Sequence, residues 1–521
     1  MKTIFQISDR NKKIVEYTLT ALLGAVLIFL LWVYSDANVN HYTLMMDSDV
    51  AADTLLGPVI YNNGFSQPET WVGSTEKCVI SAPNLAAFLY PVTGHDMNLS
   101  MGLACTVMMI IMTALMVLYF KQLGFSAIQI LSAIIIAFTL MTADESDEIQ
   151  SMIFLYAAYY VSHFITLFLI LMIYNRSIKK NKISMWIFAL TLLLSFLNGL
   201  QGMHACIFCY MPILGIEIVR RIVTFFKKEK QGNIMILLWL FATSFLAFFA
   251  TNFTGSYNLG ASRNIRHAGE KFTEIVWPFF LDVISFAKMP VLVAIFCILA
   301  AVGYFFTGKR LLLGPKEETL TSGDWSTFAL IAGVVVCIMS STFTTAEAAP
   351  RYYIMIIFVV GAGTALFMRK FGKEATAIVA VLVIIYGAVK SGGFCRDLIV
   401  NDNSDTKPPM LVAKWMEERG YEYGYSTFDH ANTITVMSND KVKIRAVNSM
   451  EELQGAKWLT DKTWYPPIKD AGSPTCYILS DALAEEFDKF LARENPTVEE
   501  IGNVEGYTIY VLDKDYTVWI D

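Results

Sequence analysis

The chain has 521 residues, of which 55% are hydrophobic and only 17% charged, and its mean hydropathy is +0.48. Soluble domains carry about 25% charged residues, and here the apolar residues gather in long runs, so the composition predicts a multi-pass α-helical membrane protein. A formal charge of −6 and the lack of a long basic tract exclude a nucleic-acid-binding protein. Eight cysteines in so long a chain exclude a disulfide-stabilised scaffold.

About eleven apolar segments are long enough to be transmembrane helices, since a bilayer-crossing helix needs about 20 mostly apolar residues. Lys and Arg concentrate in alternate connections, such as Lys179-Lys180 and Arg220-Arg221, so we expect these connections and the N-terminus to be cytoplasmic. An odd number of spans then puts the C-terminal segment outside. The expected spans are 16–34, 99–120, 126–142, 152–174, 184–199, 205–220, 233–251, 289–306, 326–343, 353–368 and 374–390.

Two apolar segments allow a second interpretation. Residues 272–288 contain Glu274, Pro278 and Asp282, and counting them as a span would reverse the orientation of everything that follows. We therefore expect an interfacial or re-entrant segment there. The first apolar run ends at residues 35–37 in a small residue that suits signal-peptide cleavage, but its length favours a retained signal-anchor.

The chain then divides into three parts. Residues 1–98 hold the first span and a long outer loop, 99–390 form the helical bundle, and 391–521 form an extracytoplasmic α/β domain. Residues 396–521 carry 23 acidic against 13 basic residues, so this last part is acidic. Its patterns predict helices at 408–419 and 481–494, and strands at 423–428, 441–447, 476–480 and within 498–513.

The first outer loop contains three acidic residues close together, Asp47, Asp49 and Asp53. Either Asp47 or Ser48 could cap a helix that starts near Val50, which would make the acids part of an ordinary helix start. The alternative is a functional acidic pair, because the motif and an amphipathic helix come straight after the first span.

The second acidic loop lies between the third and fourth spans and includes Asp144 and Glu145. Alone it is a hydrophilic turn. If the two acidic loops converge at the outer face, their carboxylates could supply a general base or a site for a divalent cation.

Few basic residues fall on the expected outer side. Arg263, Arg266 and His267 lie in one loop, and Arg351 follows Glu347 by one helical turn at the start of a late span. Arginine and tyrosine at a membrane interface are often simple anchors. The alternative is a phosphate-binding site, since the guanidinium group offers paired donors to phosphate oxygens.

This arrangement resembles the GT-C membrane glycosyltransferases, among them the protein O-mannosyltransferases, the aminoarabinose transferases of lipid A and the oligosaccharyltransferase catalytic subunit. The features that carry the resemblance are the acidic pair and helix after the first span, the second acidic loop and the sequence Pro350-Arg351-Tyr352. The stretch GYSTFDHANTITVMSNDKVKIRAV also resembles the tail domains of bacterial members. The likeness covers the whole chain as architecture and about 25 residues as motifs.

The resemblance implies transfer of a sugar from a polyprenyl-phosphate donor to a glycan, lipid or protein acceptor, with inversion by single displacement. Asp47, or else Asp49, would be the catalytic carboxylate, because a positioned base helps a poorly nucleophilic hydroxyl. Cations would stabilise the departing phosphate. No cofactor follows with certainty from the resemblance, and the acidic outer loops could hold a divalent cation. The expected substrate-binding residues are Asp144, Glu145, His204, Arg263, Arg266, His267, Glu347, Arg351 and Tyr352.

Three further motifs have structural and functional interpretations. His204, Cys206 and Cys209 could bind zinc, although buried cysteines are common in membrane helices. His163 lies in the middle of the expected fourth span, where a packing role is favoured over a proton relay. Residues 361–363 (Gly-Ala-Gly) lie within a span and predict close helix packing.

Two other functions remain open. A transporter or lipid flippase would place charged residues along a path through the membrane and often has two similar halves, neither of which is evident here. An envelope-assembly protein could instead use a glycan-binding outer domain, with Trp458, Trp464 and Tyr465 as a sugar platform. In each case the lipid bilayer is a partner and the expected location is a bacterial plasma membrane.

Overall fold

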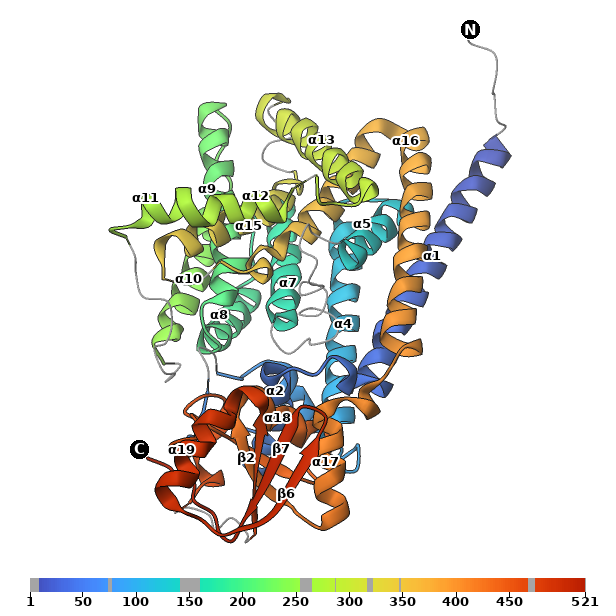
Figure 1. The fold of residues 1–521 in the computed structure, drawn as a ribbon. Coiled ribbons are helices and arrows are strands. Elements are labelled where there is room, and N and C mark those ends of the chain that lie inside the picture. The colour runs from blue at the N-terminus through green and yellow to red at the C-terminus, as the bar shows by residue number, and fades with distance from the viewer. Residues whose placement is uncertain are drawn as a thin grey trace. The chain divides into compact units, whose positions relative to one another are not determined.

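The computed structural model describes residues 9–73, 77–140, 160–253, 265–285, 287–315, 322–345, 348–466 and 474–520. These residues fall into two compact units (Figure 1). The helical unit takes its described residues from Met1–Tyr34, Val107–Thr254 and Gly260–Arg396. The mixed unit takes them from Ser35–Thr106 and Asp397–Asp521. The loop after the first span and the C-terminal part of the chain therefore belong to one unit.

Seven helical segments among the described residues are long and apolar enough to cross a membrane. They contain α1 (Asp9–Asn40), α4 (Met97–Gln122), α7 (Val161–Lys180), α10 (Ile234–Ala250), α13 (Val291–Leu313), α15 (Trp325–Phe343) and α16 (Met355–Cys395). The unit also contains two shorter apolar helices, α5 (Ala127–Thr139) and α8 (Met185–Leu200). A further helix, the more polar α9, spans Met211–Phe226. The expected total of about eleven spans and their orientation stay predictions.

Helix α16 contains two of the expected spans, 353–368 and 374–390. They are separated at Gly372, whose φ of 84° and ψ of −164° are not helical. Glycine adopts this backbone conformation readily because it has no Cβ. The chain therefore bends between two apolar stretches.

The Gly-Ala-Gly pattern at 361–363 packs helices closely, as predicted. A Cβ atom added to Gly361 would lie 2.4 Å from the backbone oxygen of Ala133 on α5. One added to Gly363 would lie 2.7 Å from Cβ of Ala300 on α13. Small residues allow such backbone approach between apolar helices.

The ambiguous segment 272–288 is a short, broken helix. It comprises the π-helical turn η5 (Phe272–Val276) and α12 (Trp277–Val283), and α11 (Ala268–Lys271) directly precedes it. These elements lie across the direction of α7 and α9 (Figure 1). Val276 and Val283 are buried while Glu274 and Asp282 are exposed. This one-sided burial and short length favour the interfacial interpretation over a transmembrane helix.

The mixed unit is built on a five-stranded sheet with the order β3-β2-β5-β7-β6. β2, β3 and β5 are parallel, and β7 pairs antiparallel with β5 and β6. Side chains alternate between the faces. For example, Ile478 packs in the core on one face of the sheet, and Tyr477 packs in the core on the other face. The strands are β2 (Tyr423–Thr427), β3 (Lys443–Val447), β5 (Thr475–Ser480), β6 (Val498–Val504) and β7 (Tyr507–Leu512).

Helices cover both faces of this sheet. α17 (Pro408–Arg419) and α18 (Phe428–Met437) pack on one face, and α19 (Ala484–Glu494) packs on the other. The expected helix at 408–419 and the expected strands are present, whereas α18 was not predicted.

The loop that follows α1 contributes three elements to the same unit. They are α2 (Ser48–Asn62), α3 (Ala82–Leu89) and the short strand β1 (Trp71–Val72), which pairs with β4 (Thr460–Asp461). α2 packs against α18 through Ala51 and Leu55, which share a buried cluster with Val436. Residues from the two ends of the chain thus form a common core.

Candidate functional site

Asp47 is the residue that caps α2. Its backbone is extended, with φ −117° and ψ 176°, and its carboxylate accepts a hydrogen bond of 2.7 Å from the backbone N–H of Val50. The capping interpretation of the acidic motif is therefore confirmed, and the helix begins at Ser48.

The Asp47 side chain keeps an exposed edge although the surrounding chain partly removes it from water. Partial burial raises the pKa of this carboxyl above its ordinary value, against the opposing effect of the N–H groups of Val50 and Asp49. A carboxylate with a raised pKa is a stronger base. The cap and a role as proton acceptor are compatible, because the residue stays exposed to solvent.

The other two acids of the motif have different surroundings. Asp49 lies in the first turn of α2 and is exposed, and Asp53 is buried one turn later. Within the described ranges, no three His, Cys, Asp or Glu side chains gather as metal ligands would. Asp144 and Glu145 lie outside the described residues, so convergence of the two acidic loops stays a prediction.

Arg351 lies in the short helical turn η6 (Pro350–Tyr353), just before α16. Its guanidinium carbon is 5.4 Å from the ring centre of Tyr352, and both side chains are half-buried. This contact holds the arginine by a cation–π attraction. Glu347 lies outside the described residues.

Arg266 and His267 are exposed at the start of α11, and His267 pairs with Glu270 at 3.1 Å. The segment that follows them contacts Thr344 and Tyr353, which lie on either side of Arg351 in the sequence. Lys271 donates a 2.7 Å hydrogen bond to the carbonyl oxygen of Thr344, and Phe280 contacts the buried ring of Tyr353. Two stretches of basic residues are thus tied to one part of the helical unit, while Arg263 lies outside the described residues.

His204 belongs to an aromatic cluster that sequence reasoning did not anticipate. Its ring lies 5.7 Å from that of His163, with 26° between their planes, and 5.2 Å from that of Tyr160. α7 begins at Val161, so His163 lies in the first turn of this helix and not in its middle, while its depth in the membrane stays a prediction. Cys206 and Cys209 are buried nearby in a π-helical turn.

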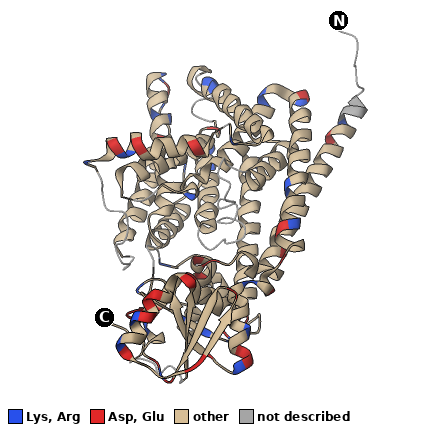
Figure 2. Cartoon of the chain, in the orientation of Figure 1, with Lys and Arg blue, Asp and Glu red and all other residues tan. Residues whose placement is uncertain are grey.

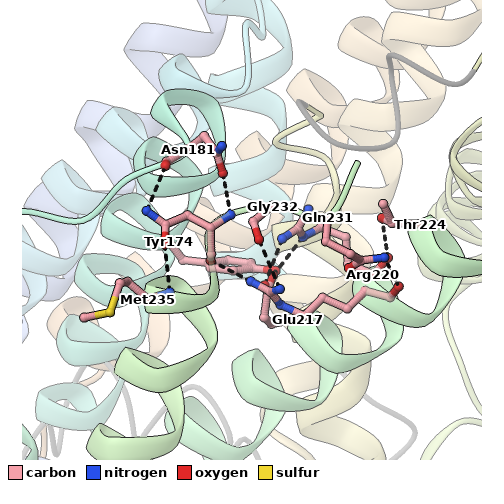
Figure 3. A network of polar contacts seen from close by, with 10 residues as sticks. Tyr174, Asn181, Glu217, Arg220, Thr224, Gln231, Gly232 and Met235 are labelled. Carbon is pink, nitrogen blue, oxygen red and sulfur yellow. Dashed lines mark hydrogen bonds and ion pairs between the residues drawn. The ribbon is translucent and has the colours of Figure 1, made fainter. Parts of the chain in front are cut away.

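An extensive polar network of the helical unit surrounds Glu217 on α9 (Figure 3). This fully buried carboxylate accepts hydrogen bonds of 2.8 Å from Nε and Nη2 of Arg220, 2.7 Å from Nε of Arg221 and 2.9 Å from the hydroxyl of Tyr174. Arg221 also donates to the carbonyl oxygens of Gly232 and Asn233. The network joins α7, α9 and the start of α10. Because side chains of the protein already bond to both oxygens of the Glu217 carboxylate, we interpret the network as structural.

A second ionic contact joins three other helices. Asp324, at the start of α15, receives hydrogen bonds from Arg310 on α13 and from Nη2 of Arg369 on α16, the latter at 2.6 Å. Figure 2 shows Lys, Arg, Asp and Glu mostly near the ends of the unit's long helices, with few along their middles. This distribution does not favour a charged transport path through the membrane.

The mixed unit contains a carboxylate–histidine–carboxylate contact. Nδ1 of His41 lies 2.6 Å from Oδ2 of Asp402, and Nε2 lies 3.7 Å from Oδ2 of Asp36. Burial raises the pKa of Asp402, but hydrogen bonds from His41 and Ser404 outweigh it, so that the pKa is lowered overall. The contact fastens residues 361 positions apart.

The three aromatic residues considered as a sugar platform are largely part of the core. Tyr465 is fully buried, and its hydroxyl bonds to the carbonyl oxygen of Ala446. The ring of Trp464 lies 4.0 Å from the guanidinium carbon of Arg445 and 5.7 Å from the ring of Trp71. Trp458 packs in a neighbouring cluster. These residues stabilise the unit and do not present a common open face.

No family model matches the chain, and no curated protein sequence matches it at a significant level.

Proposed function

We propose that the protein is a GT-C type glycosyltransferase that moves a sugar from a polyprenyl-phosphate donor to a glycan, lipid or protein acceptor at the outer face of a bacterial plasma membrane. The observation that carries the proposal is Asp47: an exposed carboxylate, fixed at a helix start, with a raised pKa. The apolar helices of the helical unit fit a lipid-borne substrate.

In this mechanism Asp47 accepts the proton of the acceptor hydroxyl as the new glycosidic bond forms. The bond between the anomeric carbon and the donor phosphate breaks, and the polyprenyl phosphate leaves with its electron pair. Arg351 stabilises the leaving phosphate, supported by Arg266 and His267. A cation near a developing phosphate charge lowers the barrier because its interaction strengthens in the transition state. A divalent cation at the acidic loops remains part of the proposal.

Asp47→Asn is the sharpest test, because asparagine caps a helix as well as aspartate does but cannot accept the proton. We expect a loss of sugar transfer of roughly 10²- to 10⁴-fold, the usual contribution of a general base, with an unchanged melting temperature. The assay follows a radiolabelled sugar from its polyprenyl-phosphate carrier to acceptors in membranes that contain the protein. Asp481→Asn, on another segment of the mixed unit, is the control. Full activity of Asp47→Asn would remove this carboxylate from the reaction.

Donor binding is tested separately with undecaprenyl phosphate and purified protein. Arg351→Ala should weaken binding, and Asp47→Asn should leave it unchanged, since the two residues have different roles. If the protein shows no saturable binding of undecaprenyl phosphate, the transferase proposal fails and the envelope-assembly function becomes the better one.

The expected orientation can be checked with alkaline phosphatase fused after residue 520 in a bacterial host. The enzyme folds to an active form only outside the cytoplasm, so activity is the expected result. An inactive fusion would place the mixed unit inside and contradict a reaction at the outer face.

A further inference from the structure

Five aromatic side chains between α2 and α4 form a continuous set of ring contacts, which we call the aromatic surface. Its members are Tyr61, Phe65, Phe88, Tyr90 and His95. The ring of Tyr61 lies 5.7 Å from that of Phe65, 5.5 Å from that of Tyr90 and 5.9 Å from that of His95. Phe65 and Phe88 stack at 4.5 Å with only 9° between their planes.

This surface is open to solvent, in contrast to the buried rings of Tyr465 and Tyr477 in the same unit. Phe65 is 43% exposed and Phe88 is 58% exposed. Exposed phenylalanine rings lack the hydrophobic stabilisation that burial in the core would provide. Contiguous exposed apolar groups of this kind mark binding surfaces.

The backbone holds two of these rings in an unusual way. Gly64 and Phe65 have φ values of 68° and 66°, and Gly94 and His95 have values of 71° and 67°. In both turns the second residue donates its N–H to the carbonyl five residues earlier, at 2.9 Å from Phe65 to Ile60 and 3.0 Å from His95 to Tyr90. Left-handed backbone is costly for a bulky residue and persists where the surroundings hold it. Both turns thereby supply a ring to the same surface.

Carboxylates border the aromatic surface. The N–H of Met97 donates a 3.0 Å hydrogen bond to Oδ1 of Asn439, which brings the neighbouring Asp440 to the start of α4, beside Asp96. Burial raises the pKa of the Tyr90 phenol, and the charges of Asp440 and Asp96 act in the same direction. The side chain of Asp440 is 40% exposed and lies 3.7 Å from Nη2 of the buried Arg445, while Asp96 caps the start of α4 through the N–H of Leu99. Carboxylate oxygens accept hydrogen bonds and donate none, so this border favours a ligand with hydroxyl donors over a phosphate, and a lipid tail would leave these carboxylates without water.

We propose that the aromatic surface is a binding site for a neutral oligosaccharide. Sugar rings present C–H groups on their faces and hydroxyl groups at their edges, which matches stacked rings bordered by hydrogen-bond acceptors. The outer face of the Phe65–Phe88 stack takes the C–H face of the sugar, and the hydroxyls of the sugar donate to Asp440 and to the phenol oxygen of Tyr90. The site is separate from Asp47 and needs no sugar donor, so it holds the acceptor glycan under the proposed function and also operates without transfer.

The test is calorimetric titration of the full chain in detergent, without donor, with maltohexaose, cellohexaose, mannohexaose and chitohexaose. We expect saturable binding of at least one of them and none of a hexamer of galacturonic acid. Phe65→Gly is the decisive variant, because glycine suits the left-handed backbone. It should keep or raise the melting temperature while it weakens binding roughly tenfold, as expected for an aromatic contact.

Phe88→Ala should weaken binding similarly, and Ile501→Ala, which removes a residue that is 54% exposed on β6, should have no effect. The absence of saturable binding to all four neutral hexamers overturns the proposal, as does unchanged binding by Phe65→Gly. Asp47→Asn should bind the hexamer as the unaltered chain does, even where it transfers no sugar. Failure of the transferase proposal and failure of this one are therefore distinguishable.

Discussion

Glu217 in the helical unit and Asp47 in the mixed unit are both carboxylates on helices, yet their surroundings suit opposite roles. Glu217 is fully buried and receives four hydrogen bonds from three side chains. Asp47 has an exposed edge and receives its side-chain hydrogen bond from the backbone of its own helix. A carboxylate whose acceptor positions are occupied by buried side chains stabilises the fold, whereas an exposed one is able to take a proton from a substrate.

The largest expected effect is on stability and concerns Glu217. Glu217→Ala leaves the buried guanidinium of Arg220 without its counter-charge, which should lower the free energy of unfolding by about 3–5 kcal/mol. Thermal unfolding in detergent measures the loss. Glu270→Ala removes an exposed carboxylate whose side chain is 72% accessible and should change the melting temperature little. Equal effects of the two substitutions would contradict a structural role for the Glu217 network.

Helix packing in the same unit offers a second test. Gly361→Ala places a methyl group against the backbone of α5, and we expect a destabilisation of about 1–3 kcal/mol from overpacking. Gly392→Ala is a matched control on the same helix, because open space surrounds that position. It should be neutral or slightly stabilising, since alanine favours a helix. A stable Gly361→Ala variant would show that α5 and α16 can separate at little cost.

The cap on α2 separates the two roles of Asp47. Asp47→Ala should lower the free energy of unfolding by about 1 kcal/mol because the N–H of Val50 loses its acceptor. Asp47→Asn should keep stability within about 0.5 kcal/mol. Both variants should lose activity equally under the transferase proposal. If only Asp47→Ala lost activity, the residue would act through the helix start alone.

The smallest effect expected is a pair of opposite pH dependences in the mixed unit. The pKa of Asp402 is lowered, so its contribution to stability is present above its ordinary value of 3.8 and is lost as the pH falls through the lowered value. The pKa of Asp47 is raised, so its contribution declines as the pH rises above 3.8. Melting curves of Asp402→Asn and Asp47→Asn between pH 3 and pH 7 should therefore deviate from the unaltered chain in opposite directions.

Local patterns predicted much of the mixed unit. The expected helix at 408–419 matches α17, and short runs rich in β-branched and aromatic residues located the strands, because both signals depend on neighbours in sequence. α18 was missed since Thr433, Ile434, Thr435 and Val436 are a β-branched run, which is unfavourable to helices. Packing against α2 and the sheet outweighs that preference.

The candidate site was only partly predictable for a related reason. The cap formed by Asp47 follows from a short motif, but the contact between His41 and Asp402 joins residues too distant for any local pattern. The spacing of Glu217, Arg220 and Arg221 on one helix was a usable signal for the buried network, since residues three and four apart share a face. The left-handed turns at Phe65 and His95 had no such signal, because each ring residue follows a glycine that alone would explain a turn.

The mixed unit is built from two chain segments that are far apart in the sequence, and this has a consequence for how the protein folds during synthesis. Its first segment ends at Thr106 and its last begins at Asp397, so the ribosome synthesises almost 300 residues between them. At about 5–20 residues per second, α2, α3 and β1 wait roughly 15–60 s for the sheet against which they pack. During that interval the apolar sides of these elements have no permanent partner. Translation speed and the chaperones that meet these elements thus become part of the folding problem, and a fragment that begins at residue 397 lacks a share of its own core.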